Sequence, residues 1–413
     1  MSRLRDNDSI IIVGSGVIGL STAYNLAKAS SDSPVKIRVI EVFTRPFTAT
    51  SSTCTGCFHY GFPESQLKPL LPLGKYSYDL WSVEAENADF KAATGYKTQS
   101  SFGIRVGKGY GLNLLPDWVK KDTSWDVNTG VLGARTATVN PIGLGKWLTE
   151  QCTSLGVEIQ TGLKVAGASL SDKNEVTAVT CLAKDGTAIC IRCKQLLLAC
   201  GPWTPTVYRT LFPSSPIHLQ WTTDAGDWIR FRNPCPRNEG STAFVSFADI
   251  VGNKLEFAGR NDGTIWACGQ RNRGAVLPLP GQIDTPDENL IAELSRYAKK
   301  WIEWRYSCTE THKTNFQLLG KGRAFRPATK SGLPVISEVP SSDLTRTETG
   351  QSQSANCSSG VFICWGHGSY GLTLGMGSGR LMSQLMRGEN PDIDISQFSL
   401  SKNCRRVEEQ PRV

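Results

Sequence analysis

A buried strand that runs directly into a glycine-rich turn constrains this chain more than any other feature. Residues 10–13 are Ile-Ile-Ile-Val, and a GxGxxG turn follows them at 14–19. A helical sequence at 21–27 comes next, and a second apolar strand at 36–40 ends in Glu41. This order of strand, glycine turn, helix, strand and acid is typical of a dinucleotide-binding βαβ unit.

Each glycine of the turn has its own physical task. Gly14 allows the tight turn, Gly16 lets the backbone approach a pyrophosphate, and Gly19 allows the helix to pack closely on the sheet. The pyrophosphate then lies at the positive N-terminal end of the helix, while the terminal acid accepts hydrogen bonds from ribose hydroxyls. An acid at that position disfavours a 2′-phosphate, so FAD and NAD both remain open. The predicted dinucleotide-binding residues are Gly14, Gly16, Val17, Ile18, Gly19 and Glu41.

Composition excludes several classes of function. The chain has 413 residues and a formal net charge of +8, but its basic residues are scattered, so we expect no nucleic-acid partner. The sequence has no apolar run long enough to span a membrane, no signal peptide, and no peroxisomal address in its last three residues, so we expect a cytoplasmic protein. Its thirteen cysteines show neither a disulfide framework nor a metal-ligand pattern, so we expect no metal.

The rest of the chain predicts two kinds of sheet. An apolar run at 195–200 ends at Gly201 and is typical of another buried parallel strand with a ligand-side loop. From about 215 to 320, successive short strands indicate an antiparallel sheet, and a helix is expected at 288–304. The predicted fold is therefore α/β, with an α+β second domain.

Four blocks of sequence resemble a known family. They are the GxGxxG unit, residues 51–62, residues 323–336 and residues 365–373. Together they resemble FAD-dependent oxidoreductases of the D-amino-acid oxidase, D-amino-acid dehydrogenase, glycine oxidase and sarcosine oxidase type. Residues 50–61 are similar to the flavin-facing loop of the bacterial D-amino-acid dehydrogenases. Residues 325–335 are similar to a family signature whose arginine binds the substrate carboxylate in several members.

The resemblance implies a Rossmann-like FAD-binding domain and an antiparallel-sheet substrate domain. The expected FAD-binding segments are 1–75, 140–210 and 322–395, and the expected substrate segments are 76–139 and 211–321. Residues 338–360 are expected to form a surface loop and residues 396–413 a C-terminal tail.

The resemblance also implies roles for individual residues. Arg326 is expected to bind the substrate carboxylate, although it could instead brace the flavin or pair with an internal acid, and Arg323 is the weaker alternative. His59, Tyr60, His367 and Tyr370 are candidate polar groups of the active site, and a purely structural role stays open for each histidine. The further residues expected to contact the cofactor are Ser51, Ser52, Gly56, Cys57, Phe58, Val165, Gly201, Arg326, His367, Gly368, Ser369, Tyr370, Gly371, Leu372 and Thr373.

The implied activity is FAD-dependent oxidation of a CH–NH bond in an amino acid or amine, by hydride transfer to flavin N5, which gives an imine. The expected partners are that small molecule and O2 or another electron acceptor. FAD is expected to be non-covalent because Ala324 stands where relatives with a cysteinyl flavin carry the cysteine; Cys54 or Cys57 remains an alternative attachment point. A tailoring oxidoreductase acting on a larger scaffold, an aromatic-hydroxylase-type monooxygenase and an inactive flavin-binding scaffold also stay open.

Overall fold

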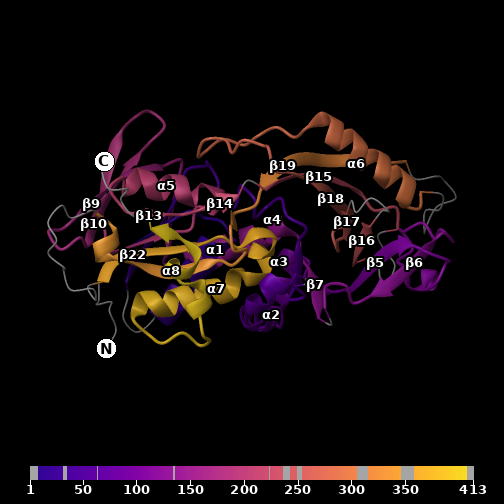
Figure 1. Cartoon of the computed structure of the whole chain (residues 1–413), viewed down its shortest axis with the longest axis horizontal. Helices are drawn as coiled ribbons and strands as arrows, with labels where there is room; N and C mark the ends of the chain where they lie inside the picture. The colour runs from indigo at the N-terminus through magenta and orange to yellow at the C-terminus, as the bar shows by residue number, and fades with distance from the viewer. Residues whose placement is uncertain are drawn as a thin grey trace, which may run out of the picture.

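The computed structural model describes residues 8–30, 35–62, 64–133, 135–222, 224–235, 242–248, 254–304, 315–345 and 358–406. In this part of the chain, a six-stranded sheet and a seven-stranded sheet form the centres of two lobes. The lobes lie side by side along the long axis of the molecule (Figure 1).

The six-stranded sheet is the predicted dinucleotide-binding sheet. Its described strands follow the order β21-β22-β12-β1-β2-β8, and all neighbours are parallel except β21 and β22. The central position of β1 explains its continuous apolar sequence, because both faces of this strand are covered. The strands are β1 (Ser9–Val13), β2 (Lys36–Glu41), β8 (Glu158–Thr161), β12 (Gln195–Leu198), β21 (Val335–Pro340) and β22 (Ser358–Trp365).

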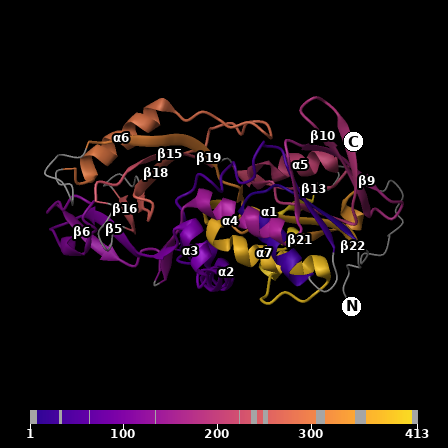
Figure 2. The same cartoon turned by 180° about the vertical axis from the view of Figure 1, so that it is seen from behind.

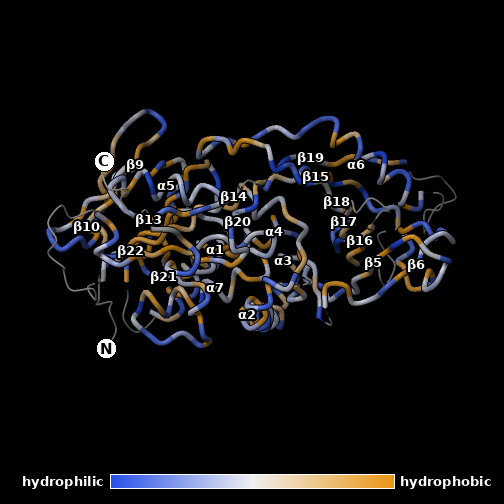
Figure 3. Tube along the Cα trace, in the orientation of Figure 1, coloured by the Kyte–Doolittle hydropathy of each residue, from blue (hydrophilic) through white to orange (hydrophobic). Residues whose placement is uncertain are grey.

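Helices cover one face of this sheet, and a small antiparallel sheet with one helix covers the other. Figure 2, which shows the molecule from behind, has these helices gathered together on one side of the lobe. In Figure 3 the hydrophobic colour concentrates around the sheet between these layers. The helical face carries α1 (Val17–Ala29), α2 (Leu71–Glu84), α3 (Ala88–Thr94), α4 (Pro141–Ser154) and α7 (Gly371–Arg387). The other face carries β9 (Lys164–Leu170), β10 (Val176–Leu182), β11 (Ala188–Arg192) and α5 (Thr204–Leu211).

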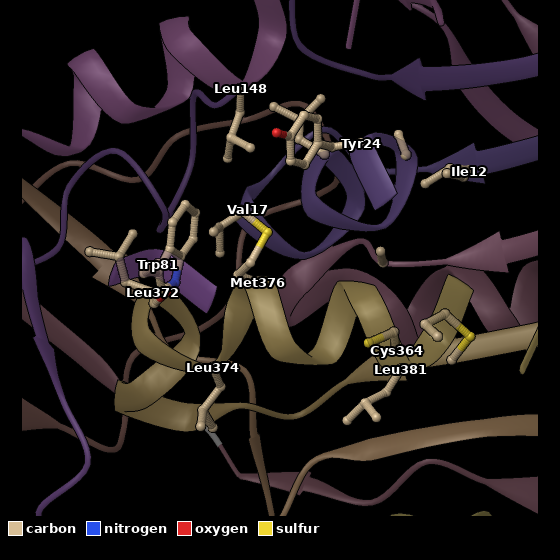
Figure 4. Packing of buried hydrophobic residues seen from close by; sticks show 14 of the residues in the cluster. Ile12, Val17, Tyr24, Trp81, Leu148, Cys364, Leu372, Leu374, Met376 and Leu381 are labelled. Atoms are coloured by element: carbon tan, nitrogen blue, oxygen red, sulfur yellow. The ribbon is translucent and has the colours of Figure 1, made fainter. Parts of the chain in front are cut away.

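The helices α1 and α7 approach each other unusually closely. Figure 4 shows Val17 of α1 beside Met376 of α7, within the same buried cluster. A Cβ built on Gly379 would lie 2.5 Å from the backbone carbon of Ser21, so only glycine fits there at this helix spacing. The contact fixes both helix N-termini near one edge of the sheet.

The seven-stranded sheet forms the second lobe. Its order is β19-β15-β18-β17-β16-β5-β6, and the neighbours are antiparallel except β16 and β5. One face packs against α6 (Glu288–Trp301) through alternate apolar residues such as Ile229, Phe257 and Val245. The strands are β5 (Ser100–Val106), β6 (Trp125–Thr129), β15 (Ala225–Arg232), β16 (Ala243–Ala248), β17 (Lys254–Gly259), β18 (Thr264–Asn272) and β19 (Leu318–Phe325).

Short elements connect the two lobes or close their edges. The strands are β3 (Cys57–His59), β4 (Lys97–Thr98), β7 (Thr136–Thr138), β13 (Ile217–His218), β14 (Trp221–Thr222), β20 (Ala328–Thr329) and β23 (Arg405–Arg406). The short helices are η1 (Ser65–Leu70), η2 (Leu112–Leu114), η3 (Gly201–Trp203), η4 (Ser341–Asp343), η5 (Gly368–Tyr370), η6 (Ser396–Phe398) and α8 (Leu400–Asn403). None of the helices in the described segments is long and apolar enough to cross a bilayer.

The predicted fold class is confirmed, but two predicted domain boundaries need correction. Residues 76–94 belong to the first lobe, because Tyr78 and Trp81 of α2 and Phe90 of α3 are buried in its core. Strand β19 starts at Leu318 and lies wholly in the second sheet, so that sheet extends to Phe325.

The predicted surface loop at 338–360 and the predicted tail at 396–413 are also more regular than expected. Strand β21 continues to Pro340, η4 follows it, and β22 starts at Ser358; the remaining loop residues 346–357 lie outside the described residues. Phe398 and Leu400 are buried, so the first part of the tail packs onto the first lobe, whereas 407–413 lie outside the described residues.

Replacing Gly379 by alanine is expected to destabilise the first lobe. The new methyl group would have to push α7 away from α1, which costs about 1–3 kcal/mol in a packed interior. Thermal unfolding followed by circular dichroism measures the effect. Gly274→Ala is the control, because a Cβ there would meet only the Asn272 side chain, at 3.6 Å. Equal melting temperatures for the two variants would contradict the argument.

Candidate active site

A cavity of about 670 Å³ extends from the β1–α1 turn to the face of the seven-stranded sheet that is opposite α6. The carboxyl ends of β1, β2, β12 and β22 form its floor, and β15, β17 and β18 form its roof. Ligands of parallel α/β sheets bind at that edge, and the volume is within the range of ligand sites. The cavity therefore brings the predicted dinucleotide site and the predicted substrate domain together.

The glycine turn has the shape that a dinucleotide needs. Gly14 has a φ of +103° and donates its N–H to the Ile40 carbonyl at 2.9 Å, which fixes the tight turn. Gly16 is the N-cap of α1 and lines the cavity, so the positive end of that helix faces the open space. A Cβ on Gly19 would lie 1.9 Å from the Gly14 carbonyl oxygen, so Gly19 serves close packing and does not line the cavity.

Glu41 is held by the same turn. Its Oε2 accepts hydrogen bonds from the Ser15 backbone N–H at 2.9 Å and the Ser15 hydroxyl at 2.5 Å, and its Oε1 accepts one from the Phe43 N–H. The carboxylate is buried at 8% exposure but lines the cavity. A carboxylate has about four acceptor positions, so capacity remains for ribose hydroxyls. These residues fit the adenosine half of a dinucleotide, and Val165 and Gly201 line the cavity beside them.

The loop at 48–56 is fixed to the second lobe by three contacts. The Thr50 hydroxyl donates to the Phe325 carbonyl at 2.6 Å, and the Trp266 indole N–H donates to the Thr53 carbonyl at 3.1 Å. The Arg260 guanidinium, 4% exposed, donates to the Cys54 carbonyl at 2.7 Å. The sheet of the second lobe therefore sets the position of the loop that resembles a flavin-facing loop.

The glycine-rich segment at 366–372 forms another wall. Gly368 has a φ of +55° and donates its N–H to the Pro327 carbonyl at 2.9 Å. Helix α7 begins at Gly371, which lines the cavity, so the N-terminal end of this helix faces the open space. The backbone N–H groups and the dipole at the N-terminal end of a helix stabilise an electron-rich carbonyl group that lies against them.

His367 is buried beside this wall. Its Nε2 lies 2.9 Å from the Ser378 hydroxyl oxygen, and burial lowers the pKa of the imidazole from 6.5 to about 3. The ring is therefore neutral at physiological pH. The cavity also includes His59 and Tyr370, whose rings meet edge to face with centroids 5.7 Å apart.

Arg326 lies at the roof end of the cavity, as its predicted role requires. Its Nη1 donates to the Asp224 carboxylate at 3.1 Å. Arg326 therefore does pair with an internal acid, which was one of the alternative roles considered for it. A Cβ on Gly226 would lie 2.8 Å from Nη2, which shows that the guanidinium rests on the sheet backbone. Arg323 instead pairs with Asp227 and Asp284 and does not line the cavity. Of these two arginines, only Arg326 lines the cavity.

Most predicted site residues line this cavity, and six do not. Phe58 stacks on Trp81 with centroids 5.0 Å apart, and Tyr60 meets Tyr78 edge to face, so both rings belong to the first lobe's core. Gly19, Ser52, Gly56 and Thr373 do not line the cavity either. The predicted residues that line the cavity are Gly14, Gly16, Val17, Ile18, Glu41, Ser51, Cys57, His59, Val165, Gly201, Arg326, His367, Gly368, Ser369, Tyr370, Gly371 and Leu372.

Several polar residues of the site were not predicted from the sequence, and four of them bear on its geometry. Arg260 fixes the 48–56 loop, Asp224 pairs with Arg326, and Glu256 and Arg271 line the roof. The strand alternation at 254–259 could have indicated Glu256, because it lies between the apolar residues Leu255 and Phe257. No local pattern pairs Asp224 with Arg326, which is 102 positions away.

The cysteines near the cavity are poor nucleophiles. Burial raises the pKa of the Cys57 thiol to about 12 and also raises the pKa of Cys54. Both thiols are therefore protonated at neutral pH, which disfavours covalent chemistry through either sulfur. Ala324, which the sequence resemblance aligns with the attachment cysteine of some relatives, lines the cavity.

Comparisons with known proteins agree with this geometry. A family model described as FAD dependent oxidoreductase matches residues 9–385. Glycine oxidase from Geobacillus kaustophilus is 17% identical with a TM-score of 0.69, over 95% of this chain and 99% of that one. L-amino acid deaminase from Proteus myxofaciens is 18% identical with a TM-score of 0.70, over 97% and 94%. Iminodiacetate oxidase from Chelativorans sp. BNC1 is 16% identical with a TM-score of 0.67, over 94% and 98%.

Replacing Arg260 by leucine is expected to weaken dinucleotide binding about tenfold. The change leaves the carbonyl groups of Cys54 and Thr55 without their charged donor. Hydrogen bonds to charged groups contribute about 1.5–3 kcal/mol. Fluorescence titration of the apoprotein with FAD measures the dissociation constant. Arg232→Leu is the control, because Arg232 is an exposed arginine on the same sheet that pairs with Gln317. Equal dissociation constants for the two variants would refute this role of Arg260.

His367 is expected to make the folded protein sensitive to mild acid. Its folded pKa of about 3 lies below the ordinary value of 6.5, so the unfolded chain binds more protons between these two values. The contribution is complete above pH 6.5 and is lost as pH falls toward 3, by at most about 1.4 kcal/mol per pH unit. Denaturant unfolding at pH 7.5, 6 and 4.5 should show a steeper loss for the native protein than for His367→Gln. Parallel curves would contradict a neutral buried imidazole.

Proposed function

Because the chain belongs to the FAD dependent oxidoreductase family, which its match over residues 9–385 shows, we propose that it oxidises a CH–NH bond of an amino acid or amine. FAD is the cofactor of this family, and the glycine turn with Glu41 fits its adenosine diphosphate half. When bound, FAD supplies the two-electron acceptor for such an oxidation. The product of the proposed reaction is an imine.

One observation supports the proposal most directly. A single cavity contains the N-terminal ends of α1 and α7 at its floor and the guanidinium of Arg326 at its roof. A flavin extended from the first helix toward the second would place its reactive ring below the arginine. A substrate carboxylate at Arg326 would then be fixed close to that ring.

The residues of the chain bind and orient rather than transfer protons. Arg326 offers a planar fork of N–H donors that matches a carboxylate. Neutral His367 lies beside the wall formed by the 366–372 segment, and within that wall Tyr370 packs against His59 to give a polar surface. Burial raises the pKa of Tyr370, so the phenol stays protonated and can donate a hydrogen bond. Such a reaction depends mainly on positioning the substrate carbon.

The flavin is proposed to be non-covalent. The protonated thiols of Cys54 and Cys57 and the methyl group of Ala324 support this arrangement. Acid precipitation of the holoprotein tests it directly, because a free cofactor stays in the yellow supernatant. A yellow pellet would contradict the proposal.

A panel of amino acids and amines tests the reaction itself. Purified holoprotein is mixed with each compound under anaerobic conditions, and the loss of flavin absorbance is followed. Peroxide formation in air and dye reduction in parallel distinguish an oxidase from a dehydrogenase. Bleaching by at least one small amine supports the proposal. No bleaching across the panel would contradict it and would favour a substrate of another kind or an inactive flavin-binding scaffold.

Replacing Arg326 by methionine is expected to raise KM for carboxylate substrates by about tenfold or more, because a charge-assisted pair contributes about 1.5–3 kcal/mol. The measurement compares an amino acid found in the panel with the corresponding amine that lacks the carboxylate. KM for the amine should change little, which controls for general damage to the site. A similar rise for both compounds would show that Arg326 braces the site instead.

A further inference from the structure

Glu256 is an acidic residue that points from the roof into the cavity. Its neighbours in β17, Leu255 and Phe257, are buried against α6 on the opposite face of the sheet. Because side chains alternate along a strand, Glu256 projects toward the first lobe, and it lines the cavity. None of the roles described above for the cofactor or the substrate carboxylate uses this acid.

The sheet register places Glu256 in the middle of the roof. It lies opposite Ser246 of β16 and opposite Cys268 of β18, which in turn lies opposite Trp228 of β15. Trp266 is on the same face as Cys268, diagonal to Glu256, and its indole is fixed by the bond to the Thr53 carbonyl. The carboxylate therefore lies beside a rigid aromatic wall.

Electrostatic effects on three other elements indicate the same central place. Burial raises the pKa of Cys57 on β3 to about 12, and the negative charge of Glu256 adds to that rise. Burial also raises the pKa of Tyr370, to which Glu64 and Glu256 contribute. Glu256 likewise favours the charged form of Arg326. The carboxylate is thus within electrostatic range of the floor, the side wall and the arginine.

The roof consequently carries opposite charges at separate positions. Arg326 and Arg271 share the single carboxylate of Asp224, at 3.1 and 3.4 Å, so that group keeps a net positive charge. Glu256 supplies a negative charge nearer the centre. A molecule with an anionic end and a cationic nitrogen complements this arrangement, whereas a neutral molecule of the same shape does not.

We propose that Glu256 receives the positively charged nitrogen of the substrate and thereby makes the cavity selective for amino-carboxylates over uncharged isosteres. The indole of Trp266 supports the same cation, since aromatic faces attract positive charge. Glu256 is a specificity residue in this scheme. The inference rests on the proposed function, because it names the class of molecule that the site takes.

Two small molecules of nearly identical shape test the inference. Glycine betaine and 3,3-dimethylbutanoate share the carboxylate and the three methyl groups, and differ in a charged nitrogen or a neutral carbon. Betaine keeps its charge at every pH and has no N–H bond, so its binding is measured without turnover. Titration of the holoprotein by flavin absorbance gives both dissociation constants. We expect the native protein to bind betaine about tenfold more tightly, or about 1.4 kcal/mol.

Matched variants locate the effect. Glu256→Gln keeps the shape and removes the charge, and it should reduce the tenfold ratio to about one. Glu256→Asp keeps the charge and should retain a preference for betaine. Glu64→Gln removes one negative charge from another part of the cavity lining, and its ratio should stay close to that of the native protein.

The outcomes separate this inference from the proposed function. Equal binding of the two molecules by the native protein, including no binding of either, overturns the role of Glu256. An unchanged ratio in Glu256→Gln, or an equal loss in Glu64→Gln, also overturns it. The amine panel reports independently on the reaction. If amines are oxidised but betaine is not bound more tightly than 3,3-dimethylbutanoate, the proposed function remains and only the role of Glu256 is overturned. Conversely, selective binding of betaine without oxidation of any amine would contradict the proposed reaction but not the role of Glu256.

Discussion

The close contact between α1 and α7 is the constraint on which the site depends. Gly379 packs directly on the backbone at Ser21, and Gly375 lies against Val17. Larger residues at these positions would separate the helices. At this spacing the N-terminal ends of both helices open on one cavity, although they are about 350 positions apart in the chain. The two ends of a long anionic cofactor can thus be bound by one rigid pair of helices.

The second lobe completes the site through hydrogen bonds to backbone carbonyl groups of the first lobe. Arg260 and Trp266 bind carbonyl groups of the 48–56 loop, so the roof and that loop form one unit. Burial lowers the pKa of Arg260, yet coulombic contact with Cys54 and Asp262 favours its charge. In the proposed reaction, the lobe that would contact the substrate therefore also fixes the loop that resembles a flavin-facing loop.

The sequence predicted those parts of the structure that depend on local patterns. The β1–α1–β2 unit, the antiparallel strands at 225–272 and the turn geometry of Gly14 follow from alternation and glycine spacing. The sequence predicted Tyr60 in the active site, but its ring packs on Tyr78 instead. The cause is the alternation of side chains in β3, which turns His59 toward the cavity and the next residue, Tyr60, away from it. The partners of Arg326 and the loop could not be predicted, because Asp224 and Arg260 lie at the ends of distant strands, which only the folded sheet brings to these positions.

The pair between Arg326 and Asp224 allows Arg326 both to pair with an internal acid and to bind a ligand carboxylate, two roles that the sequence left open as alternatives. An arginine that only paired with an internal acid would have its charge cancelled. Here Arg271 shares the same acid, so two guanidinium groups face one carboxylate. Asp224 also accepts the Arg326 backbone N–H through its own carbonyl, at 2.8 Å, which limits movement of the whole residue. The acid therefore orients Arg326 while one positive charge remains for a ligand, and an oriented guanidinium loses less entropy when it binds a carboxylate.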